Sequence, residues 1–249
     1  MSRGKVGVYE DLLKAARAYH SEPPEGEAGY MRYLASVREK ESELGQLALD
    51  FLVRWGGAST ARVFPKRARG LLQKSLNAWF DHHSSMIRSL GRYAIQSVDL
   101  SEIVPHVCDL FESLRQVRQP RVGGRNRTFG STAAGKTLHL LLPDLCPIWD
   151  QRWIRDPLSL DDQAWSYVTY IRVAKALVIR VVGDVSNKSQ LAPDLAINRL
   201  VQRHEADVVR LQRKEPVTKI LDEAVYDPSF RSQWVKPLLS NIDDLPWNN

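Results

Sequence analysis

The sequence predicts an all-α protein, and three observations support this fold class. Apolar residues recur at helical spacing along most of the chain, as they do within residues 8–20, and this spacing is typical of amphipathic helices. Glycine and proline stand mainly between such segments, where helices begin and end. The short apolar run Val178–Val182 would fit a strand by itself, but it lies inside a longer helical pattern.

In the first half of the chain, each expected boundary has a local cause. The Pro23–Pro24 pair ends the first helix, because a residue before proline avoids helical backbone. The Gly56–Gly57 pair ends the next one, since glycine is common just after a helix. Pro65 can open a helix, where its missing N–H is not needed. The hydroxyl of Ser101 can cap the helix that follows.

In the second half, a basic glycine-rich segment, residues 118–130, is the expected loop before an apolar helix. Residues 143–147 contain two prolines and form a stiff connection to Asp150, which begins the next helix. The expected helices of the whole chain are Val8–His20, Gly29–Trp55 (as one helix or two), one from Pro65, one from Ser101 to about Val117, Ser131–Leu142, one from Asp150, Asp161–Val182, Pro193–Leu211, Pro216–Val225 and Pro228–Leu239.

The composition is that of an ordinary soluble globular protein, with 43% apolar and 26% charged residues. No apolar run reaches the roughly 18 residues of a membrane span, so we expect no contact with a membrane. The first residues lack the apolar segment of a secretory signal. Only two cysteines occur, Cys108 and Cys146, and we expect a cytoplasmic protein whose thiols are reduced and buried.

Positive charge is concentrated in two stretches that contain no acidic residue. Residues 51–80 hold six lysines and arginines, and residues 113–143 hold six more. The net charge of the whole chain is only +6, so the remaining residues are net acidic. Two solvated helix faces that lack acids by chance are one explanation. A split this uneven favours a polyanion-binding face, and we expect double-stranded DNA as the partner.

Residues 130–137, GSTAAGKT, match the phosphate-binding pattern G-x-x-x-x-G-K-[ST]. A working P-loop follows an apolar strand of a parallel sheet and leads into a long helix. Here the preceding residues are basic and polar, and Pro143 soon follows. A P-loop nucleoside triphosphatase is therefore only an alternative. The glycine-rich loop can instead offer main-chain N–H groups to a DNA phosphate, and the small residues 133–135 let another backbone pack closely.

The order of features around this motif resembles that of helix-hairpin-helix DNA glycosylases. The glycines at 123, 124 and 130, the helix STAAGKTLHLLL, the connection PDLCPIW and Asp150 follow one another within residues 120–155. The family's Leu-Pro-Gly-Val-Gly hairpin is missing, and Asp150 follows Pro-Ile-Trp rather than Pro-Val. The resemblance implies a two-lobed helical protein with a basic cleft. One lobe would span about residues 56–160, and the other residues 1–55 plus 161–249.

The resemblance also implies a function and a catalytic carboxylate. Members of the family excise damaged or modified bases, and some relatives look like phage-defence enzymes that remove modified cytosines such as glucosylated hydroxymethylcytosine. Cleavage of a base–sugar bond builds positive charge on the sugar, which a fixed carboxylate stabilises. Asp150 fits this role, although it can also serve only as a helix cap. Lys136 is expected in the same site, as a pocket residue or a phosphate contact.

Such an enzyme turns its target base out of the duplex and holds it against aromatic surfaces. The candidates for the base pocket are Trp149 and Trp153, which flank Asp150, and His139, although all three also fit a helical core. The candidates for phosphate contacts lie in the basic loop, beside Asp150 and in the basic run of residues 62–70: Arg121, Arg125, Arg127, Arg152, Arg62, Lys66 and Arg67.

The sequence therefore predicts a DNA N-glycosylase that needs no metal, organic cofactor or obligate protein partner. The His82–His83 pair is more typical of an exposed surface than of a metal site, and two cysteines do not form a metal cluster. A DNA-binding protein without enzymatic activity is the main alternative, because the same basic face would serve it. Base repair and attack on modified phage DNA are both open.

Overall fold

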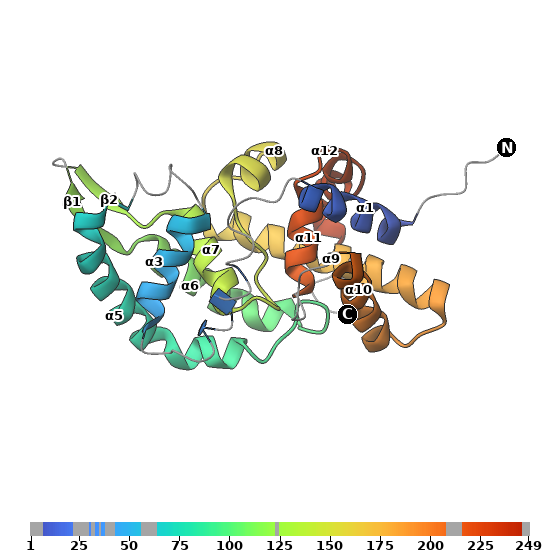
Figure 1. Cartoon of the computed structure of the whole chain (residues 1–249), viewed down its shortest axis with the longest axis horizontal. Helices are drawn as coiled ribbons and strands as arrows, with labels where there is room; N and C mark the ends of the chain where they lie inside the picture. The colour runs from blue at the N-terminus through green and yellow to red at the C-terminus, as the bar shows by residue number, and fades with distance from the viewer. Residues whose placement is uncertain are drawn as a thin grey trace.

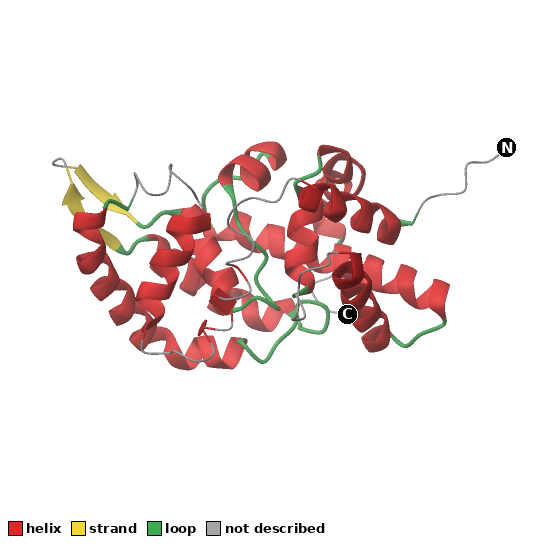
Figure 2. Ribbon diagram, in the orientation of Figure 1, coloured by secondary structure: helices red, strands yellow, loops and turns green. Residues whose placement is uncertain are grey.

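The computed structural model describes residues 7–21, 30, 33–34, 36–37, 43–55, 64–122, 125–207 and 216–245. These residues are mostly helical, which confirms the predicted fold class, and Figure 2 shows a β-hairpin at one end. The elements are α1 (Val8–Ser21), α3 (Leu44–Trp55), α5 (Lys66–Leu90), α6 (Leu100–Arg115), β1 (Arg118–Val122), β2 (Arg125–Thr128), α7 (Ser131–Leu141), the π-helix η2 (Gln151–Arg155), α8 (Asp156–Leu158), α9 (Ala164–Ser189), α10 (Pro193–Asp207), α11 (Val217–Val225), α12 (Pro228–Phe230), the π-helix η3 (Arg231–Val235), α13 (Lys236–Ser240) and the 3-10 helix η4 (Ile242–Asp244).

The elements gather in two groups along the long axis of the molecule (Figure 1). The hairpin, α3, α5, α6 and α7 lie toward one end, and α1, α10, α11 and α12 lie toward the other. Helix α9 joins the groups, because it packs against α6 as well as against α1, α10 and α11. Helix α3 packs on α5 and α7. The lobe boundaries near residues 56 and 161 stay a prediction.

Helix α9 is largely buried and packs on helices of both groups. Valines such as Val178 and Val182 are weak helix formers, yet the whole stretch Ala164–Ser189 is helical. The side chains of Tyr167, Ile171 and Val181 are buried among those of the neighbouring helices. Burial of an apolar face therefore outweighs the intrinsic strand preference of the valine run.

The basic segment expected as a loop is an antiparallel β-hairpin, so that prediction was wrong. Arg118 pairs with Thr128, and Gln119 pairs with Arg127. The strands carry mainly polar side chains and show no apolar alternation, which is why the sequence pattern does not reveal them. The hairpin is held instead by its packing on α5. The rings of Phe64 and Phe129 lie 5.7 Å apart at its base.

Some helix boundaries differ from those expected. Helix α6 begins at Leu100 rather than after Ser101, because the carboxylate of Asp99 caps it and accepts the Ser101 N–H at 2.8 Å. Helix α9 begins at Ala164, after a turn in which Asp161 accepts the Gln163 N–H at 2.9 Å, and it continues to Ser189, past the expected end at Val182. The expected helix Pro228–Leu239 is divided into α12, η3 and α13. The expected end of the Pro193–Leu211 helix lies outside the described residues.

The two cysteines differ in their surroundings. Cys146 is fully buried, whereas Cys108 is only partly buried, and both are free thiols. Burial raises the pKa of Cys146 to about 12, so this side chain stays an uncharged thiol. In the described part of the chain, no helix combines the length and the apolar character needed to cross a bilayer.

Candidate functional site

Asp150 lies where the stiff segment after α7 meets η2. The hydroxyl of Tyr167 donates to the carbonyl of Pro147 at 3.1 Å and ties this segment to α9. Asp150 is the N-cap of η2, and its Oδ1 accepts the N–H of Trp153 at 3.2 Å. Its carbonyl oxygen accepts the N–H groups of both Ile154 and Arg155 at 3.0 Å. These contacts hold the carboxylate in one place and confirm that Asp150 caps a helix.

The other carboxylate oxygen of Asp150 pairs with Lys136. The distance from Lys136 Nζ to Asp150 Oδ2 is 2.8 Å, and the two side chains are 9% and 14% exposed. Lys136 lies within α7, so the pair joins two separate elements. Burying an ion pair costs solvation free energy that the attraction does not always repay. A pair that is nearly buried yet open at one edge is therefore a candidate for function rather than for stability alone.

Gly135 sets the distance between α7 and the segment that carries Asp150. A Cβ atom at position 135 would lie 2.2 Å from Cβ of Trp149, which is far inside van der Waals contact. The close approach expected from the small residues 133–135 is confirmed. Gly135 and Trp149 immediately precede Lys136 and Asp150, so their contact brings the ammonium and the carboxylate together.

Residues 130–137 do not form a phosphate loop. Gly130 has a φ of 84°, a backbone conformation that favours glycine, and it caps α7. The residues after it are helical, and the Ala134 N–H donates to the Gly130 carbonyl at 3.0 Å. The strand before it belongs to an antiparallel hairpin. From Ala134 onward the N–H groups are thus used inside the helix, and Lys136 pairs with Asp150 instead.

A second acidic side chain, Asp222 of α11, interacts electrostatically with both members of this pair. Asp222 is fully buried, and neither carboxyl oxygen has a hydrogen-bond partner among the described residues. Burial raises its pKa to about 8, Glu223 and Asp150 add to this increase, and Lys219 and Lys136 oppose it. The buried carboxyl of Asp222 therefore holds its proton more tightly than an exposed aspartate does.

Helix α11 also contains a closed ion pair. Lys219 and Glu223 lie one turn apart, are 0% exposed and pair at 2.5 Å. The ammonium of Lys219 also lies over the rings of Tyr19 and Tyr30, at 5.0 and 5.5 Å from their centroids. No atom of these two side chains is open to solvent, so this pair belongs to the structural core.

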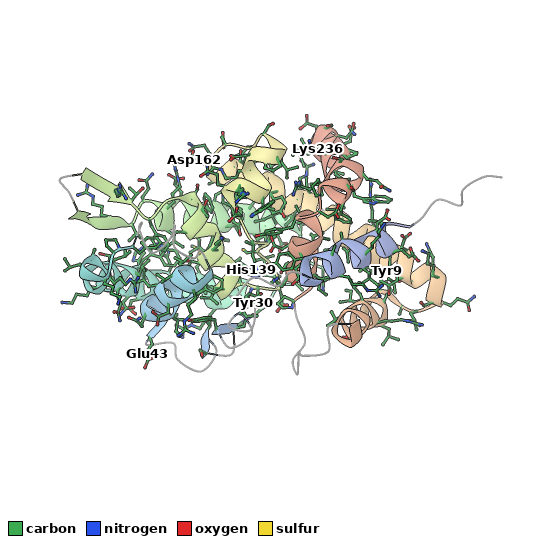
Figure 3. The ribbon with its side chains drawn as sticks, turned by 45° about the horizontal axis from the view of Figure 1, so that its top comes forward. Tyr9, Tyr30, Glu43, His139, Asp162 and Lys236 are labelled. Carbon is green, nitrogen blue, oxygen red and sulfur yellow. The ribbon has the colours of Figure 1, made fainter. Side chains whose placement is uncertain are left out.

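His139, a candidate for the base pocket, is a fully buried residue of the core beside Tyr30 (Figure 3). Its Nδ1 lies 2.7 Å from the Cys146 carbonyl, and its Nε2 lies 2.5 Å from the Tyr30 hydroxyl. A carbonyl can only accept, so Nδ1 carries the proton and Nε2 accepts from Tyr30. Burial lowers the pKa of His139 to about 3, and the ring is neutral at physiological pH.

The aromatic candidates beside Asp150 differ in exposure. Trp149 is fully buried and meets the rings of Phe111 and Tyr167 edge-on, at 6.4 and 5.4 Å. Trp149 is thus a core residue. Trp153 is partly exposed, and its ring lies 5.2 Å from that of Tyr226.

The aromatic surface beside the site extends beyond the residues expected from the sequence. The ring of Tyr226 lies 5.1 Å from that of Tyr19 of α1, and both side chains are partly exposed. Together with Trp153 they form a row, which we call the aromatic row. The pKa of Tyr226 is raised by burial of its hydroxyl and by the charges of Asp222 and Asp150. The aromatic row therefore reaches the charged groups of the site.

The two acid-free stretches lie together in the structure, because α5 packs against β1. Lys66 at the start of α5, Arg127 on β2 and Arg152 on η2 are exposed. The guanidinium of Arg152 lies 4.7 Å from the ring centroid of Trp153, beside the aromatic row. Exposed cations thus occur both at the hairpin and next to Asp150.

Other basic residues do not add to this surface. Arg115 pairs with Glu112 at 2.5 Å and with Asp162 at 3.6 Å. The remaining candidates for phosphate contacts lie outside the described residues, either entirely or by their side chains: Arg62, Arg67, Arg121 and Arg125.

Two cavities lie away from the Lys136–Asp150 pair. One of about 1040 Å³ lies between α5 and α6 and is lined by His82, His83 and His106, and one of about 580 Å³ lies near Phe80. Neither pair member lines either cavity. Within the described ranges, no three His, Cys, Asp or Glu side chains are arranged to hold a metal ion. The candidate site is therefore identified by its buried charges and unpartnered polar atoms, and not by a cavity.

Comparison of the chain with protein-family models, curated proteins and solved structures gave no match. The resemblance to helix-hairpin-helix DNA glycosylases, carried by residues 120–155, therefore stays a prediction. The function has to be inferred from the residues of the site and their geometry.

Proposed function

We propose that the protein is a DNA glycosylase in which Asp150 and Lys136 cleave the bond between a damaged or modified base and its deoxyribose. The observation that carries this proposal is the Lys136–Asp150 pair. Its carboxylate is fixed by a helix cap, its ammonium lies 2.8 Å away, and both side chains retain some exposure. The pair joins α7 to the start of η2.

The proposed reaction uses the two charges separately. As the C1′–N bond breaks, its electron pair leaves with the base, which takes a proton from the Lys136 ammonium. Positive charge develops on the sugar, and the Asp150 carboxylate stabilises it. Water then adds to C1′ and gives up a proton that restores the ammonium. The products are a free base and an abasic site, and both side chains return to their starting states.

The surroundings of the pair support binding of an extruded nucleotide. Base flipping requires a flat apolar surface for the base and cations for the flanking phosphates. The aromatic row of Trp153, Tyr226 and Tyr19 lies beside Asp150, and Arg152 is exposed next to it. We assign the base contact to this row rather than to Trp149 and His139, which are buried. The exposed cations of the hairpin and α5 would hold the duplex.

The test is release of a base. Purified protein is incubated with genomic DNA from phages that carry unmodified, hydroxymethylated or glucosylated cytosine, and with damaged duplexes. Mass spectrometry identifies released bases, and cleavage at abasic sites gives the rate. We expect Asp150→Asn to slow release by about 10²–10³-fold and to keep DNA binding. The matched control is Asp156→Asn, an exposed aspartate on the neighbouring helix α8.

Two results would contradict the proposal. Release that is equally fast with Asp150→Asn would remove Asp150 from the chemistry. DNA binding without release from any of these substrates would favour the alternative of a DNA-binding protein without enzymatic activity, which the exposed cations of Lys66 and Arg127 would also serve.

A further inference from the structure

Arg231, at the start of η3, is a buried cation whose partners are main-chain carbonyls. It is 7% exposed, and no ion pair among the described residues includes it. A buried charge is costly unless hydrogen bonds or an opposite charge compensate it. The guanidinium of Arg231 is compensated by the carbonyl oxygens of two separate segments of the chain. These hydrogen bonds hold the main chain at the place where the two segments meet.

A single nitrogen of Arg231, Nη1, reaches both segments. It donates to the carbonyls of Val225 and Tyr226 at 2.7 and 3.0 Å, and it lies 3.5 Å from the carbonyl oxygen of Trp153. Val225 ends α11, and the last carbonyls of a helix lack partners inside it and carry partial negative charge. A cap of α11 alone would need only the first two carbonyls. The third belongs to η2, so Arg231 also joins η2 to the end of α11.

The turn after α11 brings Arg231 back to the end of that helix. The Oδ1 atom of Asp227 accepts the N–H groups of Ser229 and Phe230 at 2.7 and 2.9 Å and caps α12. The N–H of Arg231 donates to the Asp227 carbonyl at 3.0 Å. These hydrogen bonds close the turn, and the guanidinium of Arg231 can therefore return to the carbonyl of Tyr226.

The two segments that Arg231 joins carry two rings of the aromatic row. The rings of Trp153 and Tyr226 lie 5.2 Å apart and are inclined at 33°. Trp153 is also held through its N–H, which donates to Asp150 Oδ1 at 3.2 Å. Asp150, Trp153, Arg231 and Tyr226 are thus linked by one series of hydrogen bonds. This series fixes the main chain beneath both rings relative to the carboxylate of Asp150.

We propose that Arg231 is a positioning residue: it holds Trp153 and Tyr226 as one surface at a fixed place beside Asp150. The inference rests on the proposed function, in which the aromatic row receives the extruded base. Arg231 is buried and acts through the two aromatic residues. A displacement of about 1 Å at a reacting centre can slow an enzymatic reaction by about 10²-fold. Loss of Arg231 should therefore slow base release and leave the phosphate contacts of the exposed cations intact.

The first test compares Arg231→Met with Arg172→Met in single-turnover base release. Methionine removes the hydrogen-bond donors and keeps a long, flexible side chain. Arg172 is a second buried arginine, on α9, and its replacement controls for the loss of a buried cation. After correction for the folded fraction, Arg231→Met should lower the maximal rate by about 10–100-fold. The DNA concentration that gives half of the maximal rate should stay unchanged. Equal maximal rates for the two variants would overturn the inference.

The second test examines the aromatic row without base release. A single-stranded oligothymidylate is titrated into each protein and into its Trp153→Phe derivative, and the difference in fluorescence gives the quenching of Trp153 by a stacked base. The wild type and Arg172→Met should be quenched alike, whereas Arg231→Met should need about tenfold more oligonucleotide. A purely structural role would not move this value at equal folded fraction. Equal quenching of all three proteins, or no quenching of Trp153 in the wild type, would contradict the inference.

A second variant covers the case in which Arg231→Met does not fold. Arg231→Lys keeps a cation that can donate to the last carbonyls of α11, so the helix end stays capped. Its side chain is shorter and loses the contact with Trp153, so both defects should remain, in smaller size. Wild-type rates and quenching in Arg231→Lys would then remove the role of Arg231.

The outcomes distinguish this inference from the function beneath it. Absence of base release by the wild type from any tested DNA removes the proposed function, and the quenching test still decides whether Arg231 organises the aromatic row. Base release by the wild type with equal rates for Arg231→Met and Arg172→Met removes only the role of Arg231.

Discussion

In the centre of the molecule two pairs of charged side chains are buried and matched, whereas at the hairpin end the charged side chains face solvent. Lys219 and Glu223 are completely buried, and Lys136 and Asp150 are nearly so. At the hairpin end, the exposed cations on α5 and the two strands are Lys66, Arg118 and Arg127. The same residue types therefore meet two dielectric environments within one chain.

Burial decides what each charge can do. A buried charge is costly to leave unpaired, so a change in the centre should alter stability or chemistry. An exposed cation is screened by salt and adds little to folding, but it attracts a polyanion at long range. The centre should therefore respond to mutation through unfolding and catalysis, and the hairpin through salt-dependent binding.

The largest loss of stability is expected from Glu223→Gln. The variant leaves the Lys219 ammonium buried without its carboxylate, which should cost about 3–5 kcal/mol of the free energy of unfolding. Urea denaturation followed by circular dichroism measures it. Replacing both residues with apolar side chains should cost less than the sum of the single changes. If Glu223→Gln loses no more free energy of unfolding than the removal of an exposed ion pair would, α11 is more accessible to solvent than the structure shows.

Asp150→Asn should separate chemistry from stability within the centre. Asparagine still caps η2, but it leaves the nearly buried Lys136 ammonium without its carboxylate. The free energy of unfolding should therefore fall, by less than the about 3–5 kcal/mol expected for a fully buried pair. Base release should fall by about 10²–10³-fold, because the negative charge opposite the sugar is lost. Single-turnover rates and urea denaturation of the same preparation measure both quantities. If the slower base release is fully explained by a smaller folded fraction of the variant, Asp150 has only a structural role.

Gly135→Ala tests the contact that brings Lys136 to Asp150. The added methyl group would lie 2.2 Å from Trp149 Cβ, and the resulting overpacking should cost about 1–3 kcal/mol. Gly183→Ala is the matched control, because a Cβ there meets nothing within 4 Å in helix α9. The control should stabilise the protein by about 0.5–1 kcal/mol. Thermal unfolding of the two variants should therefore shift in opposite directions.

The smallest effect is expected at the hairpin. Arg127→Ser should leave the midpoint of urea unfolding unchanged and weaken binding to DNA of any sequence. The slope of log affinity against log salt concentration should decrease in size by about 1, as for the loss of one phosphate contact. Fluorescence anisotropy at several salt concentrations gives this slope. An unaltered slope would remove β2 from the DNA-binding surface.

Part of this architecture could be predicted from local patterns. The apolar spacing and the Pro and Gly boundaries predict α1, α7 and α11 closely, and the start of α5, because these signals act within one helix. The cap at Asp150 was also predictable, since an aspartate before a helix satisfies free N–H groups. The hairpin of residues 118–128 was not, because its stability comes from packing on α5.

The candidate site divides in the same way. Asp150 and Lys136 were expected in one site from the resemblance within residues 120–155, but no sequence pattern indicated Asp222 or Tyr226. In the segment VTKILDEAV, Asp222 looks like any polar residue of an amphipathic helix. Only the packing of α1 and α9 around α11 buries it. Conversely, Trp149 and His139 had the right residue types for a pocket and lie in the core.

Local residue patterns establish the helical class, several helix boundaries and the uneven distribution of positive charge, because each depends on neighbours a few positions away. The tertiary structure decided which charges are paired, which acid keeps its proton and which aromatic rings face solvent. These properties depend on burial and on distances between segments remote in the chain. The pairing of Lys136 with Asp150 and the isolation of Asp222 arise from that packing.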